Sequence, residues 1–209
     1  MVYNETMDLL VAILLFLLGA VFGSFINVLI DRIPRGESVL GGRSYCEKCK
    51  KHIKPYDMIP IISYMLLSGK CRNCKSKIPK RILTVEFLSG LLFAVLFVFG
   101  NVTTPLLFVF LCATSLILLT IAIIDIEHGI ISDALLIALG FFSVIYIFFL
   151  NPLLFTGHLI TALVAFSFLF IIFATTRGKG IGFGDVKFAF FMGFLLGPLL
   201  TVVAFYTAF

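Results

Sequence analysis

The sequence predicts an all-α polytopic membrane protein with about six transmembrane helices and a cytoplasmic zinc-binding insert after the first helix. Composition is the first indication, because 61% of the 209 residues are hydrophobic and only 13% are charged, against about 25% in an ordinary soluble domain. A mean hydropathy of +1.15 excludes a water-soluble enzyme and a disordered tail. The length of the apolar stretches and the clustering of basic residues are the second and third indications.

Six apolar stretches are long enough to cross a bilayer, which takes about 20 helical residues. The stretches are Leu9–Ile30, Ile82–Gly100, Pro105–Ile124, Ala134–Leu150, Leu153–Thr175 and Phe188–Phe209. The fourth is the shortest. The first is expected to be a retained helix and not a cleavable signal peptide, because acidic residues precede it and a basic segment does not.

The orientation follows from the basic residues. Of the 16 Lys and Arg residues, 13 lie between Arg32 and Arg81, and the other three follow residue 176. Because positive residues remain in the cytoplasm, the N-terminus, Asn101 and Asn151 are expected to face outward. The cytoplasmic segments are then 31–81, 125–133 and 176–187. Orientation accounts for the net charge of +5 without a nucleic-acid partner.

Four of the five cysteines form two Cys-x-x-Cys pairs separated by 21 residues. The pairs are Cys46 with Cys49 and Cys71 with Cys74. Two such turns complete a tetrahedral four-thiolate shell, so structural zinc is the expected occupant, with iron or a redox pair as alternatives. A reducing cytoplasm disfavours disulfides. The apolar segment 58–67 between the pairs is too short to span, and either lies on the membrane surface or packs under the cysteine turns.

Two aspartates lie at the cytoplasmic ends of predicted spans. Asp125 directly follows the third span, and Asp185 ends the run Gly182-Phe183-Gly184-Asp185 just before the sixth. The two spans between them form an out-and-back hairpin, so the carboxylates can meet at one membrane face. Such a pair can share a proton and activate water against an amide, one carboxylate acting as base and the other as acid. Gly182 and Gly184 permit backbone bends and close approach of a substrate chain.

Other polar residues have simpler interpretations. Asp133 is expected to cap a helix N-terminus, and His158, near the outer face, has no expected role. Glu86 differs, because it lies four residues into the second span, where an ionisable group is costly and usually functional or paired. Arg81 and Lys80 are its candidate partners.

The motifs together resemble the type IV prepilin peptidases. The run Gly23-Ser24-Phe25-Ile26-Asn27-Val28, followed by Arg32-Ile33-Pro34, is similar to the opening signature of that family. The paired Cys-x-x-Cys module, the Pro60–Tyr64 segment, Glu86, Asp125 and the Gly-x-Gly-Asp motif continue the resemblance in order, over roughly residues 20–190.

The resemblance implies an aspartic endopeptidase of the bacterial cytoplasmic (inner) membrane, which clips leader peptides from prepilins or pseudopilins for type IV pili or protein secretion. Asp125 and Asp185 correspond by motif to the family's catalytic aspartates. Members with the zinc module often also methylate the new N-terminus with S-adenosylmethionine, which the residues alone neither show nor exclude. Gly23 and Asn27, and then Glu86, are the methyltransferase candidates.

The expected organisation is a first transmembrane helix over 1–30, a four-cysteine zinc domain over 31–81 and a membrane-embedded protease domain over 82–209. Only 24 residues follow Asp185, whereas the family usually adds further hydrophobic helices, so either a shortened member or a truncated chain is expected. Two alternatives remain open. One is a proton- or cation-coupled carrier, which the location of both aspartates at one face disfavours. The other is a zinc-bearing scaffold of a pilus or secretion assembly, in which the aspartates are inert.

Overall fold

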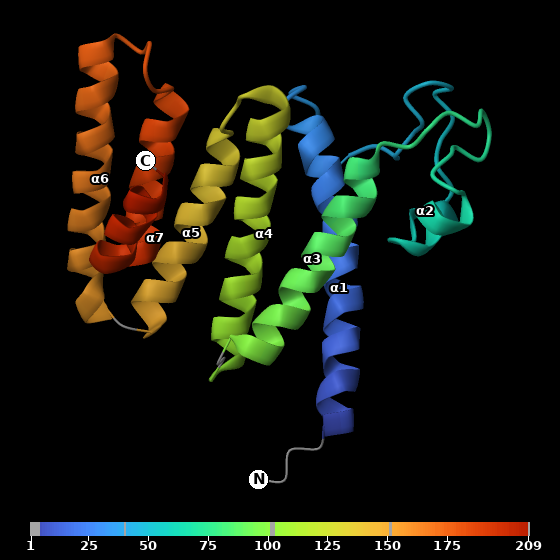
Figure 1. Cartoon of the computed structure of the whole chain (residues 1–209), viewed down its shortest axis with the longest axis horizontal. Helices are drawn as coiled ribbons and strands as arrows, with labels where there is room; N and C mark the ends of the chain where they lie inside the picture. The colour runs from blue at the N-terminus through green and yellow to red at the C-terminus, as the bar shows by residue number, and fades with distance from the viewer. Residues whose placement is uncertain (1–4, 40, 101–102, 151, 209) are drawn as a thin grey trace. The chain divides into compact units, whose positions relative to one another are not determined.

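The computed structural model describes residues 5–39, 41–100, 103–150 and 152–208, and these residues are mostly helical. In chain order the elements are α1 (Glu5–Arg32), the 3-10 turn η1 (Pro55–Met58), α2 (Ile62–Leu66), α3 (Lys80–Phe99), α4 (Pro105–His128), α5 (Asp133–Leu150), the 3-10 turn η2 (Pro152–Leu154), α6 (Phe155–Thr176) and α7 (Phe183–Ala208) (Figure 1). They form two compact units, Met1–Leu116 and Ile117–Phe209, and the boundary falls within α4.

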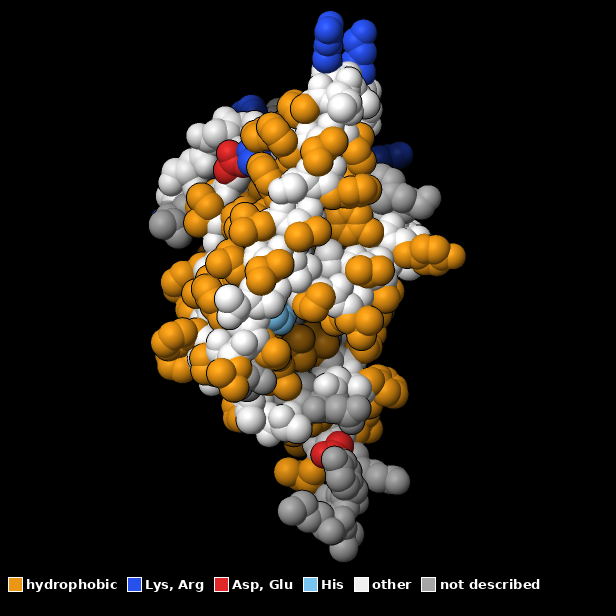
Figure 2. Space-filling model, turned by 90° about the vertical axis from the view of Figure 1, so that its left-hand side faces the viewer, with side chains coloured by type: hydrophobic (Ala, Val, Ile, Leu, Met, Phe, Trp, Pro, Cys, Tyr) orange, Lys and Arg blue, Asp and Glu red, His pale blue; other side chains and the backbone are white. Residues whose placement is uncertain are grey.

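The expected membrane architecture is confirmed. Five helices, α1, α3, α4, α6 and α7, are long and apolar enough to cross a bilayer, and α5 is a shorter apolar helix. Figure 2 looks onto the α6 side of the molecule. There hydrophobic side chains cover the flank, and Lys and Arg side chains gather at one end. The chain is therefore a multi-pass membrane protein.

In the first unit, α1 and α3 pack together through glycines. A β-carbon at Gly19 would lie 2.5 Å from the carbonyl oxygen of Ser89, and one at Gly23 would lie 2.7 Å from Cα of Glu86. Gly90 on α3 approaches Phe16 equally closely, with 2.7 Å between its would-be β-carbon and the Phe16 oxygen. The Gly19 and Gly23 pair has the small-xxx-small spacing that lets membrane helices approach this closely.

The cysteine insert emerges where α1 ends and α3 begins. At this end of the helix pair the Arg81 guanidinium bonds to the Asp31 carboxylate at 2.6 Å. The loops between these two residues form two small antiparallel bridges, Tyr45 with His52 and Lys70 with Lys77. In Figure 1 these loops lie to one side of the two helices, and α2 is part of the same insert.

In the second unit, α6 packs along α7 around two apolar clusters. One cluster consists of Ala165, Leu169, Val186 and Ala189, and the other of Ile147, Ala162 and Phe194. α5 approaches α7 where a β-carbon at Gly140 would lie 2.6 Å from the ring of Phe191. These contacts fix the start of α7 relative to the neighbouring helices of the same unit.

The last expected span is not one continuous helix. Gly197 has φ 70° and ψ −176°, which breaks α7, and the following Pro198 has no N–H for the carbonyl of Phe194 four residues earlier. Nδ1 of His158 lies 2.7 Å from that carbonyl oxygen and donates to it in the matching tautomer. His158 therefore has a structural role that the sequence did not suggest. Beyond the break the chain turns back along α6, where the rings of Phe205 and Phe168 are 5.9 Å apart.

Candidate active site and metal centre

The four paired cysteines meet in one cluster. Their sulfur atoms all lie within 4.8 Å of one another, and Sγ of Cys46 is 3.7 Å from Sγ of Cys74. The two turns repeat the same hydrogen bonds: the N–H of Lys50 donates to the carbonyl of Cys46 at 2.8 Å, and that of Lys75 donates to Cys71 at 3.0 Å. Both lysines have a positive φ, 56° and 58°. Four thiols at this separation fit a tetrahedral metal shell, so the cluster can hold a metal ion.

The thiols of Cys46 and Cys49 differ in pKa because their surroundings differ. The backbone N–H of Cys49, assisted by the Ser76 hydroxyl and opposed by desolvation, lowers the pKa of Cys46 to about 6. The pKa of Cys49 is raised to about 11, because desolvation and the neighbouring thiols outweigh the N–H of Lys51 that favours the thiolate. A thiolate is the form that binds metal, so Cys46 is prepared for that role.

Asp185 lies in the first turn of α7, where it closes the helix start. Its Oδ2 accepts the N–H of Gly182 at 3.2 Å, and its own N–H donates to the Gly182 carbonyl at 3.2 Å. This is the side-chain half of a capping box. A carboxylate here is also favoured by the positive end of the helix dipole.

Asp125 lies in the last turn of α4, the opposite kind of helix end. The N–H of Gly129 donates to the Asp125 carbonyl at 2.8 Å, and Gly129 ends the helix with φ 65°, as helix-terminating glycines commonly do. The Asp125 side chain is exposed. Negative charge is disfavoured at a helix C-terminus, so its electrostatic setting is the reverse of that at Asp185.

The start of α7 is joined at two points to the loop that follows α4 and to the first residue of α5. A β-carbon at Gly184 would lie 3.2 Å from Cβ of Ile131, and the Lys187 ammonium pairs with the Asp133 carboxylate. As Figure 1 shows, the C-terminal end of α4 and the N-terminal end of α7 therefore lie at the same end of this unit. The side chains of Asp125 and Asp185, both exposed, make no hydrogen bond with each other among the described residues.

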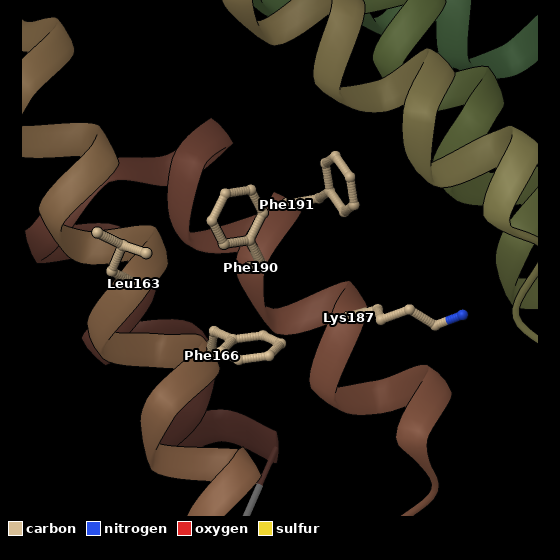
Figure 3. Close-up of a pocket in the computed structure, with 5 residues that line it drawn as sticks. All are labelled: Leu163, Phe166, Lys187, Phe190 and Phe191. Atoms are coloured by element: carbon tan, nitrogen blue, oxygen red, sulfur yellow. The ribbon is translucent and has the colours of Figure 1, made fainter.

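An open hollow lies between α6 and α7, and one of its lining residues, Lys187, follows Asp185 by two positions. It is lined by Leu163 and Phe166 from α6 and by Lys187, Phe190 and Phe191 from α7, and its volume is about 320 Å³. In Figure 3 the rings of Phe166 and Phe190 lie between the two helices, whereas the ring of Phe191 points away from α6, and Lys187 is the only cation among the residues drawn. An apolar surface of this kind suits a hydrophobic segment.

Gly23, Asn27 and Glu86 lie together between α1 and α3. The Asn27 amide donates to the carbonyls of Gly23 at 3.2 Å and of Ile82 at 3.1 Å, and Oε2 of Glu86 accepts the N–H of Ile61 at 2.7 Å. The partners of Glu86 are therefore a backbone N–H of the insert and the Ser24 hydroxyl of α1, where the sequence suggested Arg81 or Lys80. Asn27 and Glu86 are only 5% and 4% exposed.

Sequence reasoning missed three structural contacts. Lys187 and Asp133 form the ion pair described above, whereas Asp133 was expected only as a helix cap. His158 completes the broken α7, and the Gly197-Pro198 dipeptide in an apolar run was the signal for that break. The contact of Ile61 with Glu86 joins a loop to a helix 25 residues away, and no local pattern reports such a pairing.

Two family models match the chain. Residues 17–99 match the bacterial peptidase A24 N-terminal domain, and residues 112–209 match the type IV leader peptidase family. A prepilin leader peptidase/N-methyltransferase of Bacillus subtilis is 32% identical over 195 residues, which covers 92% of this chain and 77% of that protein. The chain belongs to the type IV leader peptidase family.

Other relatives have the same name. The prepilin leader peptidase/N-methyltransferase of Pseudomonas aeruginosa is 29% identical over 85% of this chain and 70% of its own. The one from Myxococcus xanthus is 42% identical over 58% of this chain and 36% of its own. No solved structure matches.

The two family models divide the candidate residues of this leader peptidase family member. The cysteine cluster and the Gly23, Asn27 and Glu86 group fall in the N-terminal segment, and both aspartates fall in the leader peptidase segment. Each group thus lies within one matched domain, and also within one compact unit of the fold.

Proposed function

We propose that this family member is an aspartic endopeptidase that cleaves the leader peptides of prepilins or pseudopilins, with Asp125 and Asp185 as its catalytic pair. The observation that carries the proposal is the junction of the α7 start with the α4–α5 loop, through Gly184 against Ile131 and Lys187 with Asp133. This junction holds the Gly-x-Gly-Asp turn at the end of the unit where α4 terminates.

The helix ends favour different roles for the two carboxylates. Asp185, which accepts the Gly182 N–H at a helix N-terminus, is suited to act as general base toward water. Asp125, at a helix C-terminus, is suited to act as general acid, which polarises the scissile carbonyl and protonates the leaving nitrogen. Catalysis through the pair requires both carboxylates to reach the same water.

The hollow beside Asp185 supports a hydrophobic substrate segment. A segment lying along Leu163, Phe166 and Phe190 would present the residues beyond its end to the start of α7. The basic residues at this level, Arg177, Lys179 and Lys187, favour the cytoplasmic side of the inner membrane for the reaction. Cleavage would then occur at the cytoplasmic face.

The cysteine cluster is proposed to hold structural zinc. Cys46, Cys49, Cys71 and Cys74 provide the four thiolates of a closed tetrahedral shell. Zinc bound there would cross-link the two cysteine turns. Because four thiolates would fill its coordination shell, we assign the metal no part in peptide cleavage.

A methyl-transfer activity with S-adenosylmethionine is a second proposal, and it rests on the names of the relatives, which are prepilin leader peptidase/N-methyltransferases. Gly23, Asn27 and Glu86 do not form an opening that fits this cofactor. Gly23 touches the backbone of α3, and the side chains of Asn27 and Glu86 are held in hydrogen bonds between α1, α3 and the insert. We therefore derive no methyl-transfer step through these three residues.

The test is cleavage of a purified prepilin by the full chain in liposomes, comparing the original protein with Asp125→Asn and Asp185→Asn at matched protein levels. Loss of a general acid or base lowers rates by roughly 10²–10⁴-fold, and we expect both variants to fall that far. Glu37→Gln, an exposed acidic residue of the insert, is the control and should cleave normally. Undiminished cleavage by either aspartate variant would exclude the pair, and pH-linked ion flux without cleavage would favour a carrier.

A further inference from the structure

The insert exposes an apolar patch that its own fold leaves uncovered. The patch consists of Tyr56, Met58, Ile59, Ile62, Met65 and Leu66, from η1, α2 and the residues between them. Met65 is 69% exposed and Leu66 is 79% exposed. Of the two sequence interpretations of this segment, packing under the cysteine turns does not account for these exposures.

The level of the patch along α3 is set by a partly buried hydrogen bond. Ile61, between Ile59 and Ile62, donates its N–H to Oε2 of Glu86. Glu86 is six residues into α3, which corresponds to about 9 Å of helix rise beyond Lys80. Helical side chains incline toward the N-terminus, so the carboxylate lies somewhat nearer to Lys80 than its own Cα does.

That level is the depth at which interfacial helices lie. Asp31, Arg32, Lys80 and Arg81 mark the polar end of the α1 and α3 pair, and apolar residues follow along both helices. Amphipathic helices bury their apolar faces about 5–10 Å into the boundary between headgroups and acyl chains. Figure 1 agrees, because α2 lies level with the first turns of α3 and not beyond its end.

The charges around the patch complement anionic lipid headgroups. Between Arg32 and Arg81 the chain has 13 basic residues and three acidic ones. Two of the cations lie on the patch itself: the Lys54 ammonium is 5.5 Å and the Arg72 guanidinium carbon 5.4 Å from the centroid of the Tyr56 ring. Arg72 also pairs with the Asp57 carboxylate at 2.6 Å, so Lys54 is the cation that the patch offers to headgroups. Basic groups beside an apolar surface bind bilayers that contain anionic lipid.

The backbone at this point is held in a strained conformation. Ile61 has φ 62° and ψ −53°, a region that β-branched residues rarely adopt. The hydrogen bond to the Glu86 carboxylate compensates for part of that cost. Ile59 and Ile62, on either side of this strained residue, are both exposed. A helical conformation at Ile61 would change the direction of the chain between them.

We propose that the apolar patch is a membrane-docking surface, which inserts into the interface of an anionic bilayer and seats the cysteine insert on the lipid surface beside α3. Glu86 is a positioning residue for this contact, because it sets the depth of Ile61. The proposal is independent of peptidase activity and would hold for a catalytically inert chain.

The chain contains no tryptophan, so a single introduced tryptophan reports on one site. Leu66→Trp and Met65→Trp test the patch, and Glu37→Trp, at an exposed position of the insert outside it, is the matched control. Each full-length variant is reconstituted in phosphatidylglycerol and phosphatidylethanolamine vesicles. Quenching by aqueous acrylamide is then compared with quenching by lipids brominated on the acyl chain.

We expect the patch tryptophans to be quenched by brominated lipid, to emit at shorter wavelength and to be roughly three-fold less sensitive to acrylamide than Glu37→Trp. Replacing the anionic lipid by phosphatidylcholine should reduce this protection, and Glu86→Leu, which removes the acceptor of the Ile61 N–H, should make the depth less defined. Acrylamide sensitivity equal to that of Glu37→Trp in both patch variants would overturn the proposal.

Three further outcomes would also overturn it. Protection that appears only when a prepilin is added would assign the patch to the substrate. Protection that rises with the protein-to-lipid ratio would assign it to a second copy of the chain. Equal protection in phosphatidylcholine would remove the role of the cations. Bound metal per chain, measured in every variant, shows that the insert is still folded.

Discussion

The cysteine cluster and the aspartate pair are assembled by different means. Each cysteine turn is built from a few consecutive residues, and the two turns repeat the same hydrogen bonds, so the four sulfur atoms come within 4.8 Å of one another. The aspartates lie at the ends of two long helices, and the contacts that bring these ends together involve neighbouring residues. The geometry of a site made of turns is set largely by local hydrogen bonds, whereas the geometry of a site made of helix ends depends on how the helices pack.

The largest expected effect is the loss of metal and of local stability when one cysteine of the cluster is replaced. Cys46→Ser removes one thiolate of four, and structural zinc contributes roughly 10 kcal/mol or more to folding in small zinc domains. We expect the variant to lose its bound metal and the insert to become sensitive to protease. Cys112→Ser, at the cysteine outside the cluster, should retain the metal.

Metal content, limited proteolysis and prepilin cleavage are measured on the same samples. If the two sites are as separate as their construction suggests, cleavage by the folded fraction of Cys46→Ser should fall much less than in Asp185→Asn. A metal-free Cys46→Ser insert of unchanged protease resistance would contradict the structural role of the metal.

A smaller effect is expected from a change at the junction between the start of α7 and the α4–α5 loop. Gly184→Ala places a β-carbon 3.2 Å from Cβ of Ile131, so the start of α7 must shift by a few tenths of an ångström. Catalytic groups are sensitive to such shifts, and we expect cleavage to fall roughly ten-fold. The matched control is Gly157→Ala, where a β-carbon meets nothing within 4 Å. Equal rates in the two variants would separate the junction from catalysis.

The smallest effect concerns the ion pair at the same junction. Lys187 and Asp133 are partly exposed, and exposed pairs are worth about 0.2–1 kcal/mol. A double-mutant cycle with Lys187→Met and Asp133→Asn, followed by thermal unfolding in detergent, should give a coupling free energy in that range. A coupling of several kcal/mol would indicate a dry, buried pair and a more closed junction than the structure has.

The sequence predicted what depends on spacing and hydropathy. The apolar stretches, the Cys-x-x-Cys pairs and the family motifs led to the helices, the cluster and the family, because each is written in adjacent residues. Topology alone also placed Asp125 and Asp185 at one end of their unit.

The remainder depends on contacts between distant residues. Glu86 finds a loop N–H and not Arg81 or Lys80, and His158 finds a carbonyl that a proline left without a donor. Neither pairing follows from hydropathy, because helix packing decides which polar groups meet in an apolar medium. The direct meeting of the two aspartates stays a prediction for the same reason.

The ion pair between Asp31 and Arg81 has a consequence for modularity. It shows that the chain leaves the helix pair and returns to it at neighbouring points, 2.6 Å apart between charged atoms. A segment whose two ends already meet can be lengthened, exchanged or replaced by a short turn at little cost in loop-closure entropy. The length of the cysteine insert can therefore vary at little entropic cost to the α1 and α3 pair, whereas removing the insert would leave the buried Glu86 carboxylate without the Ile61 N–H.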